Sequence, residues 1–270
     1  MCHYCGHSQS VPQRCPECGG PVKRVGTGVQ KVQQELETYF SDISVERMDA
    51  DTVSATNTHE VILDRFQKEH ISVLIGTQMV AKGLNLPDVT LVGVLDGDLS
   101  LYTDNYRAAE TTFNMLTQVV GRAGRGDASG RAMIQTYVPE HSVITLAAKQ
   151  DYDSFYELEI GLRKQLRRPP FGDLAVITLT GQDQNQILYG AAKLKTSLQT
   201  LLQQQNISGT VLGPAPSPVP KVNYNYRFRL TLQCKMDRPL RLFLADLLRQ
   251  FAKDRQNRGV SAYIDINGFD

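Results

Sequence analysis

Several features are absent from this 270-residue sequence, and each absence excludes a class of protein. No apolar run approaches the roughly 20 residues of a membrane-spanning helix, so no membrane partner is expected. The N-terminus has no basic segment followed by an apolar stretch, so a secretory signal is not expected and the reducing cytoplasm is the predicted location. The formal net charge is only +1, so any basic nucleic-acid surface must be local.

A phosphate-binding loop is also absent. Neither GxxxxGKS nor GxxxxGKT occurs, and no acidic DExH-type motif follows an apolar strand. The chain therefore lacks the groups that cradle nucleotide phosphates and hold Mg²⁺. Any nucleotide site to which it contributes must be completed by residues that it does not contain.

The pattern along the chain predicts a small appendage and two domains. Residues 1–22 are rich in Cys, Gly and Pro and have almost no apolar periodicity. Over residues 23–167, short β-branched runs alternate with amphipathic helices, which predicts a parallel sheet with helices on both faces. Over residues 168–270, the predicted order β-α-β-β-α-β is that of a ferredoxin-like α+β domain. A proline-rich loop is expected after the strand that ends at Leu212.

Two cysteine pairs in the appendage have the spacing of metal-ligand half-sites. Cys2 and Cys5 form one CxxC pair, and Cys15 and Cys18 form the other. Four thiolates in two knuckles are the tetrahedral set that zinc prefers, so these residues are the candidate ligands of a structural Zn²⁺. A redox pair or unligated thiols remain the alternatives. Cys234 lies inside an apolar strand and is predicted to be a small buried hydrophobe.

The segment VLIGTQMVAKGLNLPD follows a buried strand and carries a first candidate site. The Thr77 hydroxyl and nearby backbone N–H groups, placed where the strand ends, can hold a phosphate of a nucleic-acid strand. Lys82 and Gly83 can approach a nucleotide. The alternative is an ordinary strand-to-helix turn with a glycine after Lys82.

A second candidate site is the segment TQVVGRAGR at residues 117–125. Arg122 and Arg125 are three residues apart, which places both guanidinium groups on one face of a helical turn beside Gln118. Planar, permanently charged guanidinium groups match phosphate oxygens, so the pattern is suited to a polyphosphate. A solvated helix end with two surface arginines is the alternative.

Together with CHYC and CPEC just before GTGVQKVQQEL, these segments resemble the second RecA-like lobe of superfamily 2 helicases. The combination narrows the resemblance to the bacterial replication-restart DNA helicases of the PriA family (primosomal protein N′). The resemblance implies that Thr77, Gln78, Lys82 and Gly83 form motif V, which contacts DNA and nucleotide. It likewise implies that Gln118, Arg122 and Arg125 form motif VI.

The resemblance to this helicase family also implies an activity, a nucleotide site and partners. ATP with Mg²⁺ would bind between this lobe and a first lobe that the chain lacks, with one of the two motif VI arginines stabilising the transferred phosphoryl group. The family has four CxxC pairs, and this chain starts at what resembles the third. The chain is therefore expected to be the C-terminal part of an ATP-dependent DNA helicase and to be inactive in isolation. Expected partners are DNA, the single-stranded-DNA-binding protein and other primosome proteins.

A third candidate surface interleaves cations with rings in the second domain. Its residues are Lys221, Tyr224, Tyr226, Arg227 and Arg229, which can pair with phosphates and stack on bases. The alternative is a loop entering a strand, with the arginines solvated. Arg238 is a candidate for holding an acidic peptide tail. A competing hypothesis makes the whole chain a zinc-stabilised DNA- and protein-binding module without catalysis.

Overall fold

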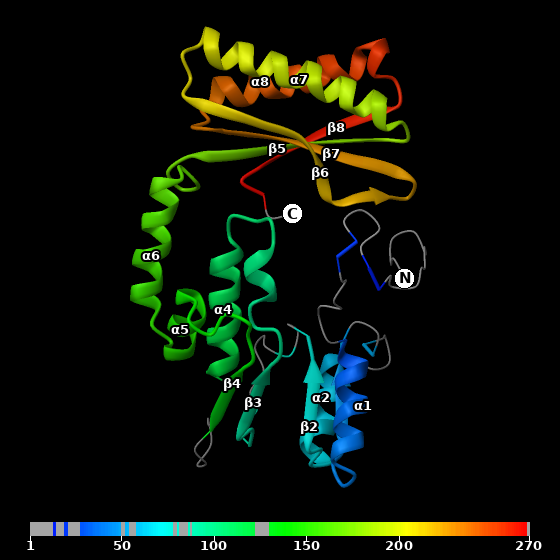
Figure 1. The fold of residues 1–270 in the computed structure, drawn as a ribbon, viewed down its shortest axis with the longest axis vertical. Coiled ribbons are helices and arrows are strands. Elements are labelled where there is room, and N and C mark those ends of the chain that lie inside the picture. The colour runs from blue at the N-terminus through cyan, green and yellow to red at the C-terminus, as the bar shows by residue number, and fades with distance from the viewer. Residues whose placement is uncertain are drawn as a thin grey trace. The chain divides into compact units, whose positions relative to one another are not determined.

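The computed structural model (Figure 1) describes residues 13–14, 19–20, 28–49, 52–53, 58–77, 80, 86, 88–121 and 130–268. Their contacts divide into two compact units. The N-terminal unit contains the described parts of residues 20–103 and 107–157. The C-terminal unit contains residues 158–268 and the segment Asp104–Tyr106. The division falls inside helix α6 (Tyr152–Gln165), upstream of residue 168, where the sequence analysis places the second domain.

The N-terminal unit is built from parallel strand pairs and helices. Its strands pair as β1 (Val45–Met48) with β2 (Val73–Gly76), and as β3 (Leu91–Val94) with β4 (Arg131–Ile134). Its helices are α1 (Val29–Tyr39), α2 (His59–Lys68), η1 (Leu99–Tyr102), α4 (Ala108–Val120) and α5 (Ser142–Lys149). Parallel pairing with helical connections fits the predicted α/β class. The described strands nevertheless form two separate two-stranded ladders, whereas the sequence predicts one sheet.

The N-terminal unit has a small buried cluster around α4. Its buried members are Phe113, Leu116, Val143, Ile144, Ala147 and Phe155. The rings of Phe113 and Phe155 stack with centroids 4.0 Å apart and planes 7° from parallel. One face of α4 is thereby held against α5 and the start of α6.

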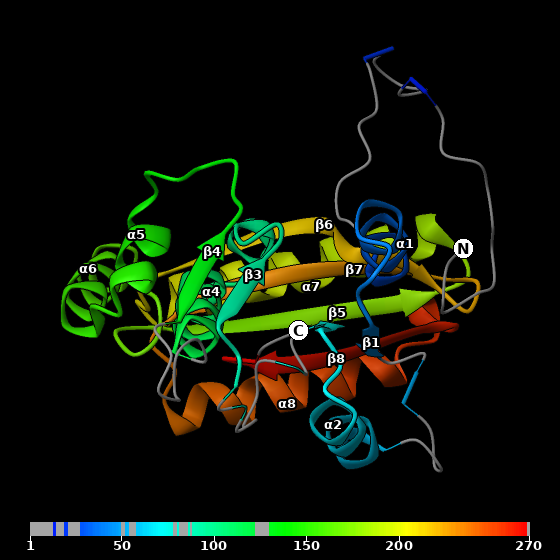
Figure 2. The same cartoon turned by 90° about the horizontal axis from the view of Figure 1, so that it is seen from below.

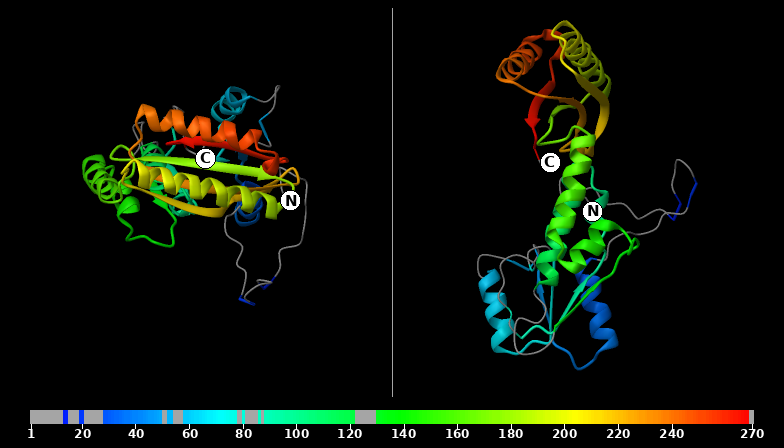
Figure 3. Two further views of the ribbon diagram at one scale, coloured as in Figure 1. Left: turned by 90° about the horizontal axis from the view of Figure 1, so that it is seen from above. Right: turned by 90° about the vertical axis from the view of Figure 1, so that its left-hand side faces the viewer.

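The C-terminal unit has the predicted order of elements. They are β5 (Asp173–Gly181), α7 (Gln184–Gln204), β6 (Gly209–Val222), β7 (Asn225–Cys234), α8 (Arg238–Lys253), η2 (Arg255–Asn257) and β8 (Val260–Ile266). The strands form one antiparallel sheet in the order β6-β7-β5-β8 (Figure 2). Helices α7 and α8 lie side by side on one face of it (Figure 3). This arrangement is the ferredoxin-like sandwich that the alternation of strands and helices predicts.

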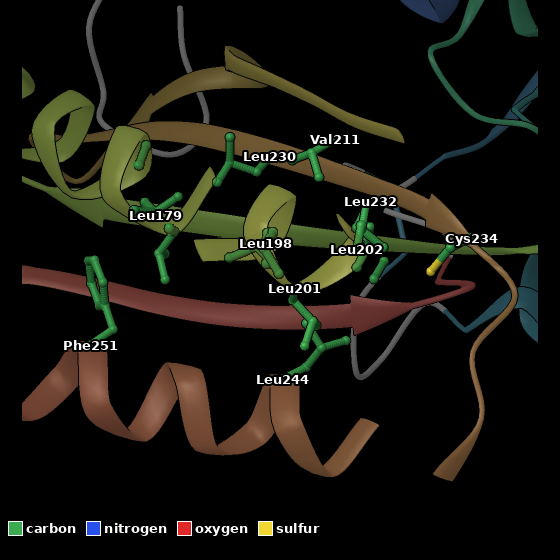
Figure 4. Close-up of a cluster of buried hydrophobic side chains, with 14 of the residues drawn as sticks. Leu179, Leu198, Leu201, Leu202, Val211, Leu230, Leu232, Cys234, Leu244 and Phe251 are labelled. Carbon is green, nitrogen blue, oxygen red and sulfur yellow. The ribbon is translucent and has the colours of Figure 1, made fainter. Parts of the chain in front are cut away.

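Alternation along the strands and periodicity along the helices explain the packing of the C-terminal unit (Figure 4). In β7, Phe228, Leu230 and Leu232 are buried, while the residues between them are half-buried. Helix α7 contributes Leu194, Leu198 and four further buried residues to the same core. The carboxylate of Asp183 caps α7 by accepting N–H bonds from Asn185 and Gln186 at 2.9 and 3.3 Å.

The proline-rich stretch after Leu212 is the clearest departure from the sequence analysis. It is predicted as a loop, but β6 continues through Pro214, Pro216, Pro218 and Pro220, with irregular pairing between Leu212 and Lys221. Strand β6 lies at the edge of the sheet, where one row of backbone N–H groups faces no neighbouring strand. Proline, which has no N–H group, is tolerated there. The loop prediction was wrong because composition does not reveal an edge.

Cys234 confirms a different prediction. It is a free cysteine at the end of β7 and only 5% exposed. Burial, followed by the negative charges of Asp173 and Asp237, raises the pKa of its thiol to about 11. It is a core residue, and its thiol stays protonated at neutral pH. Among all the residues that the structure describes, no helix is long and apolar enough to cross a membrane.

Candidate functional site

Thr77 lies where the sequence analysis places it, directly after the carboxyl end of β2. Strands β1 and β2 run parallel with Met48 opposite Gly76, so both end at the same edge of their ladder. A Cβ atom on Gly76 would lie 2.5 Å from the Met48 carbonyl oxygen, too close for any larger residue. Thr77 is exposed, and its carbonyl oxygen accepts an N–H bond from Val80 at 3.0 Å. Ligands of open α/β sheets bind at such strand ends.

The neighbouring strand ends in a buried polar cluster that sequence reasoning missed. Asp49, which is 6% exposed, forms an ion pair with Arg47 at 2.6 Å. Its other carboxylate oxygen accepts the backbone N–H of Thr52 at 3.0 Å. Because removing one partner of a buried ion pair leaves an uncompensated charge, loss of Arg47 would be costly here. The only signal in the sequence is an Arg-x-Asp pattern at the end of a predicted strand.

Helix α4 carries Gln118 and leads into the arginine segment. Its buried face, with Phe113 and Leu116, packs into the N-terminal core, and Gln118 is exposed. The helix ends at Val120, and the N–H group of Gly121 donates to the Thr117 carbonyl oxygen at 3.0 Å. A Cβ atom on Gly121 would lie 3.3 Å from the side-chain nitrogen of Gln150. This described stretch ends at Gly121, directly before Arg122 in the sequence.

Several predicted site residues lie outside the described residues. They are Gln78, Lys82, Gly83, Arg122, Arg125 and the four cysteines Cys2, Cys5, Cys15 and Cys18. The role proposed for each of them remains a prediction. Among the residues that the structure does describe, no group of three or more His, Cys, Asp or Glu side chains is placed to hold a metal ion.

The cation-and-ring segment of the second domain is not a loop but the end of a β-hairpin. Lys221 lies opposite Tyr226, and its amine is 4.5 Å from the centroid of the Tyr226 ring. Tyr226 is partly buried against the core of the unit, so part of this ring is already covered. Tyr224, between the two strands, is 75% exposed. The hairpin thus separates the two tyrosines that the sequence groups together.

Arg227 and Arg229 point to the sheet face opposite Phe228 and Leu230. Arg227 donates a hydrogen bond to the Tyr263 hydroxyl at 3.1 Å. Arg229 forms an ion pair with Asp104, which belongs to the same compact unit. Sequence reasoning missed Tyr263, although it is the middle exposed residue of the alternating strand β8 and is 48% exposed.

Arg238 is the first residue of α8 and is exposed. The preceding Asp237 caps this helix by accepting the Leu240 N–H at 2.9 Å. A cation in the first helical turn is not favoured by the helix dipole. The Arg238 side chain therefore lies at the surface, and its role as a partner-binding residue stays a prediction.

The comparisons with known proteins match both units. Residues 23–127 match the helicase conserved C-terminal domain, and residues 164–268 match the primosomal protein N C-terminal domain. The Replication restart protein PriA of Bacillus subtilis is 38% identical over 99% of this chain and 33% of its own length. The chain belongs to the PriA family. It corresponds to the C-terminal part of PriA.

Other PriA relatives extend the same likeness. The PriA protein of Synechocystis is 40% identical over 80% of this chain and 26% of its own length. That of Haemophilus influenzae is 33% identical over 98% of this chain and 36% of its own length. The chain thus spans about a third of the length of the curated relatives that it matches.

Proposed function

We propose that this chain supplies the second helicase lobe and the C-terminal domain of an ATP-dependent DNA helicase that restarts replication. The observation that carries the proposal is the match of a helicase C-terminal domain and a primosomal C-terminal domain in one chain, in that order. Its relatives are named replication restart proteins, which supports the same role. No phosphate-binding loop occurs in the 270 residues, so the nucleotide would be held jointly with another lobe.

Within this proposal, the two motifs have separate tasks. Arg122 and Arg125, following α4 and Gln118, stabilise the charge that develops on the transferred phosphoryl group. Lys82 and Gly83 approach the nucleotide, while Thr77 and Gln78 contact a DNA phosphate. The exposed position of Thr77 at the end of a parallel strand supports its part of this assignment.

The other ligands follow from the same proposal. Cys2, Cys5, Cys15 and Cys18 are the proposed Zn²⁺ ligands, which metal analysis of the purified chain can test. Lys221, Tyr224, Tyr226, Arg227 and Arg229 form the proposed DNA-binding surface, although Tyr226 and Arg229 already have partners inside the protein. Arg238 is proposed to hold the acidic tail of the single-stranded-DNA-binding protein.

Phosphate release from ATP tests the composite site. The chain alone is expected to hydrolyse no ATP. Mixing it with the N-terminal part of the Bacillus subtilis relative should restore DNA-stimulated hydrolysis, and Arg125→Ala should reduce that rate roughly 10³-fold or more. Arg131→Ala, which removes an exposed arginine from β4, is the matched control and should leave the rate unchanged. Full activity of Arg125→Ala would show that Arg125 is not the arginine finger.

A non-catalytic binding module is the competing function, and one observation favours it. The C-terminal unit has a complete antiparallel sheet with its own core. Anisotropy titrations of forked DNA at two salt concentrations measure binding directly. Tight, salt-sensitive binding without ATP, together with no restored hydrolysis in the mixture, would favour the module over the helicase.

A further inference from the structure

The turn between β6 and β7 places a tyrosine in an unfavourable backbone conformation. Asn223 and Tyr224 are the two residues between the paired Val222 and Asn225, and their φ angles are 47° and 65°. Two-residue hairpin turns with positive φ at both central positions are type I′ turns, for which Asn-Gly is strongly preferred. Asn223 suits this turn. A tyrosine in the second position meets steric resistance that a glycine would not.

No burial of the Tyr224 ring offsets this cost. The side chain is 75% exposed at the end of the hairpin. Eight described non-glycine residues have a positive φ, and Tyr224 is the only tyrosine among them. Four of the eight are Asn or Asp, the residues that tolerate this region best: Asp96, Asn206, Asn223 and Asn267. A strained residue that gains nothing inside the fold points to a role outside it.

The arm that carries Tyr224 is stiff. Four prolines alternate with other residues along β6, and each restricts its own φ to a narrow range. Below the turn, the amine of Lys221 lies 4.5 Å from the centroid of the Tyr226 ring and ties the two strands together. The prolines and the Lys221–Tyr226 contact therefore restrict the backbone of the hairpin that carries Tyr224.

Charge indicates the class of ligand. Residues 184–236 contain no Asp or Glu and six cations, of which Lys193 is paired with Asp254 and Arg229 with Asp104; the others are Lys195, Lys221, Arg227 and Lys235. The hairpin lies wholly inside this acid-free segment, with Lys221 and Arg227 on either side of the turn. An exposed ring beside cations is complementary to a base beside phosphates.

We propose that Tyr224 is a stacking contact for an unpaired nucleotide, held outward by the strained turn, with Lys221 beside it for the backbone phosphate. The inference deepens the DNA-binding part of the proposed function and rests on it. It also distinguishes Tyr224 from Tyr226, whose ring already contacts the amine of Lys221.

The variant Tyr224→Gly tests the proposal because it should preserve or raise the stability of the protein while it weakens DNA binding. Glycine relieves the unfavourable φ, so the midpoint of thermal unfolding should stay the same or rise. Loss of the ring should weaken binding of the 270-residue chain to a labelled oligothymidylate roughly tenfold. Tyr224→Phe keeps the ring and should bind as the unchanged chain does. Tyr189→Ala removes another half-exposed tyrosine, from α7, and should not change the affinity.

A fluorescent reporter supplies a second measurement, because the sequence contains no tryptophan. The single tryptophan of Tyr224→Trp should be quenched when oligothymidylate stacks on it, whereas that of Tyr189→Trp should not. If the unchanged chain binds oligothymidylate and Tyr224→Gly binds it equally well, the stacking proposal is overturned while DNA binding stands. If the unchanged chain binds neither single-stranded nor forked DNA, the DNA-binding surface and this inference fall together.

Discussion

The two units of this chain differ in how completely their described residues pack. In the C-terminal unit, 19 buried residues form one cluster between a four-stranded sheet and two helices. In the described part of the N-terminal unit, the corresponding cluster has six buried residues, and the strands form two separate ladders. The proposed nucleotide-binding motifs belong to the N-terminal unit, where they follow the end of strand β2 and the end of helix α4. Among the described residues, the unit with the smaller buried cluster thus carries the proposed chemistry, and the unit with the larger cluster carries the proposed DNA-binding hairpin.

Truncating one core leucine in each unit should give the largest effects and should separate the units. Leu230→Ala in β7 and Leu116→Ala in α4 both remove fully buried side chains, each at a cost of about 2–5 kcal/mol. If the units unfold independently, each substitution lowers only the denaturant midpoint of its own unit. Hydrogen exchange read by mass spectrometry assigns each transition to its peptides. A single transition shifted equally by both variants would contradict the division into two units.

Removing a helix cap from each unit should give smaller and unequal effects. Asp183→Ala deletes a charged cap that accepts two N–H bonds, and should destabilise the C-terminal unit by about 1 kcal/mol. Thr58→Ala deletes a neutral cap with one long bond of 3.4 Å to Val61 and should cost less. Urea titrations of the two variants compare the losses. A larger loss for Thr58→Ala would show that cap geometry does not determine this difference.

The smallest effect at neutral pH concerns Cys234. Its pKa is raised to about 11 in the folded protein, from an ordinary value of 9.0, so folding favours the protonated thiol. The associated stability is fully present below pH 9 and is lost as the pH rises toward 11. At neutral pH the buried thiol should resist iodoacetamide until the C-terminal unit unfolds. Mass spectrometry of the peptide containing Cys234 checks this, and rapid labelling of the native chain would contradict its burial.

The sequence is informative wherever a pattern is local. Alternation in β7 and β8 and the apolar spacing of α7 and α8 suffice for the order of the C-terminal elements. The burial of Cys234 follows from its place in an apolar strand. Proline composition is misleading for β6. A strand tolerates prolines when it lies at the edge of a sheet, and the edge position of β6 cannot be read from its local sequence.

In the candidate sites, too, local features can be read from the sequence and contacts between distant residues cannot. The end of β2 and the glycine that precedes Thr77 are readable from the sequence, since a β-branched run ends there. The pairing of Arg227 with Tyr263 is not, because it joins strands that are distant in sequence and separated in the sheet by β5. The partner of Lys221 was likewise hidden, since only the hairpin register brings Tyr226 opposite it.

The prolines of β6 also limit how other proteins can extend this sheet. A peptide that binds by strand addition needs a row of free backbone donors and acceptors along an edge. Four prolines in β6 remove donors from that edge, so added chains are disfavoured there. The opposite edge, β8, contains no proline between Val260 and Ile266. Within this sheet, backbone donors that strand addition needs are therefore less depleted by proline at β8 than at β6.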